Sequence, residues 1–311
     1  MKSARTFSFL CLAVLLSIGA SIHAREKVSL QVTYPDGRTI KYKHKYSFAF
    51  KSDRAEVIVP GRTQRGFTSG EIRGEWRSRE VIHAGTDGES NAQATRLVAT
   101  LNKAVNGFFF ENKRLTHDQF PYTLEQLDDW EFTWFLSSDG AVQRQTSNNS
   151  ARDLNRPDVL TDLWQIWTPE LKPVLPENPV GPGDTWSGEV NFKTPVMMID
   201  DEAIVELKST YKVKNIATKK GNKIVTFEED RKVRFRAPVN IGSLQLVVDG
   251  TGEGKGTWVI DATRGIVISH KVRSNLTRPE VRRVDHRKPV DNIRAEIDLS
   301  YERKLDKVEK E

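Results

Sequence analysis

The sequence predicts a protein of the α+β class, built mainly from antiparallel strands in curved sheets or a half-barrel, with two helices on the concave side. The main observation is that apolar residues recur at every second position over most of the chain, the period of a strand with one buried face. Turn-forming residues separate these alternating stretches. In two places the spacing changes to that of a helix.

The first alternating stretches predict a hairpin. Residues 28–34 alternate, Pro35-Asp36-Gly37 forms a turn, and residues 40–50 alternate again. The second strand carries its apolar face on Ile40, Tyr42, His44, Tyr46, Phe48 and Phe50, with Lys41, Lys43 and Lys45 on the other face. Further strands are expected at residues 71–83, 130–136 and 141–146.

Helical spacing appears twice. Ser90 and Gln93 have the spacing of a capping box, and a helix of about four turns is expected to follow and to end at Gly107. Its apolar stripe would be Ala94, Leu97, Val98, Leu101 and Val105. A second helix is expected after Asn155 and Pro157, with a stripe of Leu160, Leu163, Trp164 and Trp167 that is either core or a lid over the sheet.

Five prolines between residues 168 and 183 exclude both a helix and a central strand there. This stretch, residues 169–183, is interpreted as a crossing between an N-terminal half, residues 25–168, and a C-terminal antiparallel half, residues 184–304. Residues 305–311 are expected to be a frayed tail of mixed charge. Within the C-terminal half, turns are expected at Lys219 to Asn222 and at Asp261 to Gly265.

The first 24 residues have the order of a secretory signal peptide: basic residues, a short apolar run and a small residue, Ala24, at the end. Cleavage after Ala24 would remove Lys2 and Arg5 and lower the net charge from +6 to +4. It would also remove Cys11, the one cysteine, and with it disulfide and thiolate chemistry. We therefore expect a secreted or periplasmic protein with no transmembrane segment after cleavage and no nucleic-acid partner.

The sequence carries no recognisable catalytic frame: HExxH, GxxxxGK[ST], GxGxxG after a strand and GxSxG are all missing. His44 and His270 each fall on an apolar face, which makes them either core histidines or polar groups inside a ligand cavity. A hydrolase would need one of them beside a carboxylate. We expect a protein that is not an enzyme and holds neither a cofactor nor a metal ion.

Charged runs are interpreted as solvated surface. The carboxylate clusters at residues 128–129, 200–202 and 228–230 lack the spacing of a calcium loop and are expected to be solvated loops. Lys41, Lys43 and Lys45 would form a basic strand face that either protects a sheet edge or meets an anionic partner.

The segment Leu175-Pro-Glu-Asn-Pro-Val-Gly-Pro-Gly-Asp-Thr-Trp186 resembles the LPxxPVxxGDxW signature of uncharacterised bacterial exported proteins. The motif is structural, because Pro-Gly-Asp forms a turn and Trp186 anchors the strand that follows. By architecture such proteins look similar to periplasmic carriers of lipoproteins, in which helices cover a curved sheet. The resemblance implies an exported location.

The functional expectation is an exported, non-catalytic envelope protein that binds an apolar or amphiphilic ligand, such as a lipid, on a curved sheet. The candidate cavity residues are Tyr42, His44, Tyr46, Trp164, Trp167 and His270. The alternative is a binding or scaffolding module for an anionic polymer or a protein partner.

Overall fold

The computed structural model describes most of the chain outside the first 25 residues. The described residues are 26–33, 35, 37–54, 57–59, 62–64, 68–86, 93–110, 113–114, 130–136, 142–148, 171–195, 202–241, 244–283 and 294–310. All structural statements below refer to these residues.

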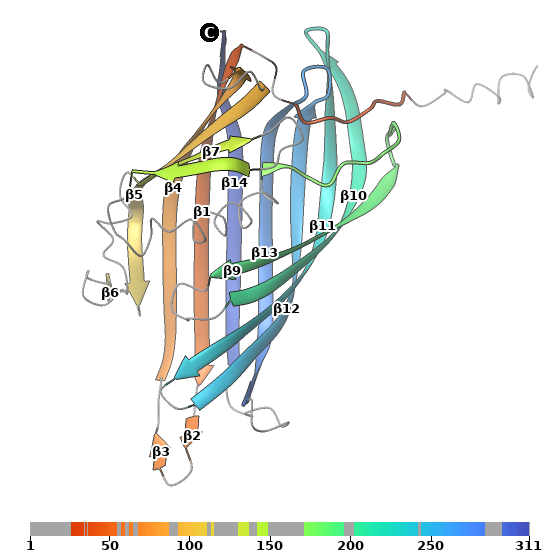
Figure 1. Ribbon diagram of the computed structural model, residues 1–311. Coiled ribbons are helices and arrows are strands. Elements are labelled where there is room, and N and C mark those ends of the chain that lie inside the picture. The colour runs from red at the N-terminus through yellow and green to blue at the C-terminus, as the bar shows by residue number, and fades with distance from the viewer. Residues whose placement is uncertain are drawn as a thin grey trace, which may run out of the picture.

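One large antiparallel sheet dominates the described part of the molecule (Figure 1). Its strands are β1 (Arg38–Arg54), β4 (Thr68–Thr86), β5 (Gln93–Phe110), β6 (Lys113–Arg114), β7 (Trp130–Leu136), β8 (Val142–Ser147), β9 (Thr185–Pro195), β10 (Glu202–Lys219), β11 (Asn222–Ile241), β12 (Leu244–Asp261), β13 (Ile266–Arg283) and β14 (Arg294–Lys310). β2 (Val57–Val59) and β3 (Arg62–Gln64) form a separate two-stranded ribbon.

The chain begins this sheet in its middle. The strand order is β8-β7-β5-β4-β1-β14-β13-β12-β11-β10-β9, with β6 paired to β5. The first strands therefore run from β1 to one edge, and the later strands return from the other edge until β14 pairs with β1. Residues 305–310, expected to fray, continue β14, and Lys310 lies opposite Arg38.

The sheet is strongly curved, and within the described residues its two edge strands, β8 and β9, do not pair with each other. In Figure 1, β9 to β12 bend away from β4, β1 and β14 and cross in front of them. We call the face that carries His44, Trp258 and His270 the covered face, because residues 26–33 and 171–184 pack on it. The other face, called the open face, carries the charged residues of each strand, among them Lys43, Lys208 and Asp306.

The helix expected from Ser90 to Gly107 is wrong, because β5 occupies that range and pairs with β4 on one side and β7 on the other. Thr95, Val98, Thr100, Val105 and the three phenylalanines after Gly107 are β-branched or aromatic residues, which favour a strand. Hydrogen bonding on both edges outweighs a helical spacing that is only a coincidence of sequence. The mainly antiparallel, curved sheet is confirmed; no helix is found within the described residues, and the expected second helix lies outside them.

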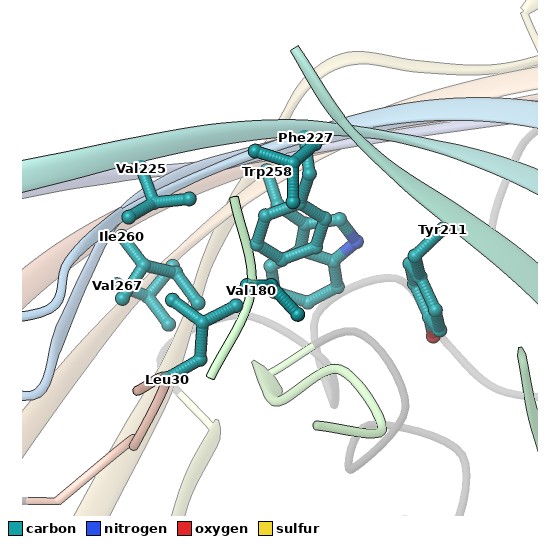
Figure 2. Close-up of a cluster of buried hydrophobic side chains, with 9 residues drawn as sticks. Leu30, Val180, Tyr211, Val225, Phe227, Trp258, Ile260 and Val267 are labelled. Atoms are coloured by element: carbon teal, nitrogen blue, oxygen red, sulfur yellow. The ribbon is translucent and has the colours of Figure 1, made fainter. Parts of the chain in front are cut away.

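Residues 28–33 do not form the expected hairpin with β1. Val28 instead exchanges two backbone hydrogen bonds with Val180, and the amide of Thr33 donates to the carbonyl of Gly265. Leu30 and Val180 lie together over Val225, Phe227 and Trp258 (Figure 2). The N-terminal segment and the proline-rich segment thus jointly cap the sheet.

The turn chemistry predicted from the sequence is confirmed at three points. Gly221 and Gly265 have positive φ angles at the β10–β11 and β12–β13 connections. Asp184 closes the Pro-Gly-Asp turn, because its amide donates to Gly181 and its carboxylate accepts from the amide of Gly181. Trp186, at the start of β9, donates its indole N–H to the carbonyl of Val174 at 2.7 Å.

Candidate functional site

A buried charged cluster lies where β4, β1 and β14 pair, and we call it the Glu80 cluster. Arg303 donates from Nε to Glu80 Oε2 and from Nη2 to Glu80 Oε1, both at 2.9 Å. Glu80 Oε2 also lies 2.8 Å from His44 Nε2. All three side chains are buried, Arg303 completely. Such a pair is tolerated in a core only when further hydrogen bonds satisfy both groups.

The protonation states in this cluster follow from its surroundings. Burial lowers the pKa of His44, although the hydrogen bond to Glu80 works in the opposite direction. Burial alone would raise the pKa of Glu80, but the positive charge of Arg303 and the bond to His44 outweigh burial, and the pKa of Glu80 falls below its usual value. A neutral His44 then donates from Nε2 to Glu80 and accepts at Nδ1 from the hydroxyl of Tyr301, 3.0 Å away.

A second cluster, the Glu229 cluster, lies on β10 to β13. Glu229 Oε1 accepts from Ser209 Oγ at 2.6 Å and from Arg231 Nε at 2.9 Å. Glu229 Oε2 accepts from the indole of Trp258 at 2.8 Å and lies 3.5 Å from His270 Nε2. Burial would raise the pKa of Glu229, but the nearby imidazole of His270 and the charge of Arg231 lower it far below the usual range.

Aromatic rings join the two clusters. His270 stacks on Trp258 with ring centroids 3.5 Å apart, and its ring meets Tyr301 edge-on at 5.5 Å. Tyr301 in turn packs against Tyr46 at 4.9 Å. Tyr42 lies under the guanidinium of Arg303, 3.7 Å from its centre. The covered face therefore has a continuous band of aromatic and ionised groups across the neighbouring strands β4, β1, β14, β13, β12 and β11.

The structure brings four of the predicted cavity residues together, namely Tyr42, His44, Tyr46 and His270, but they are packed rather than lining an empty space. Their exposed fractions are 1%, 4%, 9% and 0%. Trp164 and Trp167 lie outside the described residues. Each histidine does have a carboxylate beside it, yet each carboxylate is also hydrogen-bonded to an arginine and buried.

Sequence reasoning missed the partners of these histidines. Glu80 and Arg303 stand in phase with apolar residues of their strands, Ile82 and Tyr301. The solvated loop expected at residues 228–230 is wrong, because Glu229 lies buried in β11 in phase with Phe227 and Val233. The sequence does carry one signal for such buried partners: a charged residue at a position where the alternation of a strand otherwise places apolar residues.

The capping segment, residues 171–184, covers part of this face. Leu171 and Val180 are buried, and Val174 and Leu175 pack against the apolar cluster. Arg303 Nη1 donates to the carbonyl of Leu171 at 2.7 Å, so the Glu80 cluster also fixes one end of the segment.

An apolar strip continues on the covered face beyond the capping segment. Its centre consists of Leu207, Val233 and Leu276, and the flanking side chains are only partly buried: Val190, Val205, Phe235 and Ile297. Leu299, on β14 two residues after Ile297, is 43% exposed. The centre of the strip is thus buried, while its flanks and the neighbouring Leu299 expose apolar surface.

The open face is charged and hollowed over β9 to β14. An open hollow of about 1080 Å³ is lined by Lys208, Lys232, Lys255 and Arg273 together with Glu189, Asp230, Glu253 and Asp298. Positive and negative groups are thus balanced in it.

The predicted basic face of β1 is balanced in the same way. Lys41 pairs with Glu309 and Lys43 with Asp306, both at 2.7 Å, while Lys45 lies opposite Glu302. Hydrogen bonds from Lys307 and Lys41 lower the pKa of Glu309 to about 2. Carboxylates of β14 thus accompany the lysines of β1.

Comparison with known proteins gives little. No family model matches the chain, and no curated protein matches it. An outer membrane channel from Pseudomonas putida F1 aligns over 89% of this chain and 98% of its own, with 8% identity and a TM-score of 0.21. A likeness at that level carries no argument. Of the described residues, none belongs to a helix of the length and hydropathy that a membrane crossing needs.

Proposed function

We propose that this protein is an exported, non-catalytic envelope protein that holds an apolar or amphiphilic molecule against the covered face of its sheet. The observation that carries the proposal is the apolar strip, which remains partly exposed where the capping segment ends. Exposed apolar surface of this kind marks a site of binding. The expected leader supports export, and the resemblance of the Leu175 to Trp186 motif agrees with it.

The arrangement of charge supports the absence of catalysis. In each cluster the carboxylate is neutralised by an arginine and, in the Glu80 cluster, the histidine is neutral and hydrogen-bonded at both nitrogens. A general base must reach the proton that it abstracts, and these groups are turned toward one another within the core. Their role in the proposal is to fix the sheet.

The test is native mass spectrometry of residues 25–311, purified without detergent and incubated with a C16 fatty acid. We expect an adduct of the mass of the acid. Leu299→Asp should lose the adduct, because a bound acyl chain would have to strip water from the carboxylate placed beside the apolar strip. Ile204→Asp is the matched control, since Ile204 is 45% exposed but lies on the open face. Absence of an adduct, or equal loss in both variants, would refute the proposal.

The hollow on the open face favours a second candidate, binding of a charged polymer or protein partner. Its four exposed basic groups stand among four acidic ones, and the fifth basic residue of the lining, Arg231, is buried beside Glu229; this mixture suits a partner of mixed charge better than a polyanion. The check is salt-dependent retention on an immobilised acidic glycan. Retention that disappears in Lys208→Gln/Lys232→Gln/Lys255→Gln, but not in Lys41→Gln/Lys43→Gln/Lys45→Gln, would place the contact in the hollow; no retention at any salt concentration would exclude a polyanionic partner.

A further inference from the structure

The capping segment is attached to the sheet differently at its two ends. At the end next to β9, the amide of Gly183 donates to Val213, and the amide of Val213 donates to Asp184. Gly183 has a φ of 92°, which only glycine adopts readily. At the other end, the attachment comes from a side chain, because Arg303 donates to the carbonyl of Leu171.

Between its ends the segment contacts the sheet through side chains and isolated hydrogen bonds. Four prolines, at positions 173, 176, 179 and 182, remove backbone donors. Within the described residues, Val180 exchanges a pair of backbone bonds with Val28, the carbonyl of Val174 accepts from Trp186, and the hydroxyl of Tyr211 also hydrogen-bonds the backbone of Val174. Segments with so few backbone bonds open locally at low free energy.

We propose that the capping segment is a strap that swings on the turn from Gly181 to Asp184 and is held shut by Arg303, and that its opening extends the apolar strip. The movement of the strap stands on its own contacts, whereas its role in ligand uptake rests on the proposed function.

Opening would uncover a surface that continues the strip. Val174 sits directly over Gly188, so closely that a Cβ on Gly188 would lie 2.4 Å from Val174 Cβ. Gly188 is two residues before Val190, a member of the strip. On the other side of Gly188, Trp186 stacks on Tyr211 with centroids 5.1 Å apart. Moving Val174 away from Gly188 therefore joins the apolar strip to the rings of Trp186 and Tyr211 in one exposed surface.

Arg303 is suited to hold the strap because it cannot move away from it. Its other two donor groups bind both oxygens of Glu80, and its guanidinium lies on the ring of Tyr42. The remaining nitrogen, Nη1, is therefore fixed at Leu171. A lysine at this position would keep a positive charge for Glu80 but lacks the planar fork that reaches a third acceptor.

The experiment uses Gly188→Ala, which adds one methyl group beneath Val174. Hydrogen exchange is followed at the amide of Val180, whose acceptor is Val28, and at the amides of β11 as a report of global unfolding. We expect exchange at Val180 to rise at least ~10-fold, as for a local opening, with β11 unchanged. Ser187→Ala, on the open face, is the control. Adding Val174→Gly to Gly188→Ala should restore slow exchange, since the methyl group then has its space.

Arg303→Lys supplies an independent variant and should also speed exchange at Val180. Unchanged exchange in Gly188→Ala would overturn the strap, as would a rise shared by β11. In the same samples, faster uptake of the C16 fatty acid by Gly188→Ala supports the role in uptake. Faster exchange without faster uptake would remove that role and leave the movement established, while no binding by any variant would count against the proposed function instead.

Discussion

Replacing Glu80 by glutamine tests the account of the buried charges. The substitution changes the shape of the side chain little but removes the counter-charge of Arg303, which is fully buried. Glu80 accepts two hydrogen bonds from Arg303 and one from His44. A glutamine offers one acceptor oxygen and turns an NH₂ group toward neighbours that are themselves donors.

The magnitude follows from these contacts. Breaking a buried ion pair from one side destabilises a protein by about 3–5 kcal/mol, because an uncompensated charge stays in the core. That is a large share of the about 5–15 kcal/mol that holds a typical domain folded. Arg303→Met should cost a similar amount, whereas Glu80→Gln/Arg303→Met should be more stable than either single variant, since it leaves no buried charge.

Urea unfolding followed by tryptophan fluorescence measures these free energies. Glu302→Gln is the control, because Glu302 lies on the same strand as Arg303 but is exposed; surface changes of this kind stay within about 0.5 kcal/mol. If Glu80→Gln were no more destabilising than Glu302→Gln, the buried charge of Arg303 would not need Glu80 as its counter-charge, and the account of the Glu80 cluster would be refuted.

Three further predictions concern the same face. Burial lowers the pKa of His44, so the unfolded chain takes up a proton below its ordinary pKa of about 6.5 more readily than the folded chain does. Stability should therefore fall as the pH drops below that value, with a slope of at most about 1.4 kcal/mol per pH unit, and His44→Gln should flatten this slope in urea titrations from pH 7 to 5.5; an equal slope in both proteins would contradict the assignment. Gly256→Ala would place a Cβ 2.9 Å from Glu229 Oε2 and 3.3 Å from the carbonyl of Lys271, so calorimetry should show a loss of about 1–3 kcal/mol, and an unchanged melting temperature would contradict the packing. Trp258→Phe keeps an aromatic ring but removes the pyrrole part of the indole, with the N–H that donates to Glu229; we expect a loss of at least about 1.5–3 kcal/mol, and a variant as stable as the parent would show that this hydrogen bond adds nothing.

The sheet could be predicted from the sequence because period-two alternation is a property of the strands themselves. The faces of β1 and β14, and the turns at Gly221 and Gly265, follow from neighbouring residues alone. The strand order could not be predicted, because nothing local tells β1 to pair with β14, more than two hundred residues away. β5 shows the same limit: its residues fit a helical stripe, and only its two partner strands decide the matter.

The histidines of the two clusters could be predicted from the sequence, whereas their partners could not. His44 and His270 stood out as polar residues within apolar faces, and the structure places both there. Their partners Glu80 and Glu229 come from other strands, so spacing along the chain could not reveal them. The prolines of the proline-rich segment exclude regular structure, and this much the sequence predicts. The hydrogen bonds that the segment accepts from Trp186 and Arg303 could not be predicted, because Arg303 reaches it only through the fold.

The most direct test of the central claim is fluorescence energy transfer from tryptophan to a dansyl-labelled acyl chain in the folded protein. The account predicts transfer that saturates with one acyl chain per protein, is displaced by unlabelled fatty acid, survives Ile204→Asp and disappears in Leu299→Asp. Transfer that never saturates, or that Leu299→Asp leaves unchanged, would contradict the claim that the covered face of this sheet holds an apolar molecule.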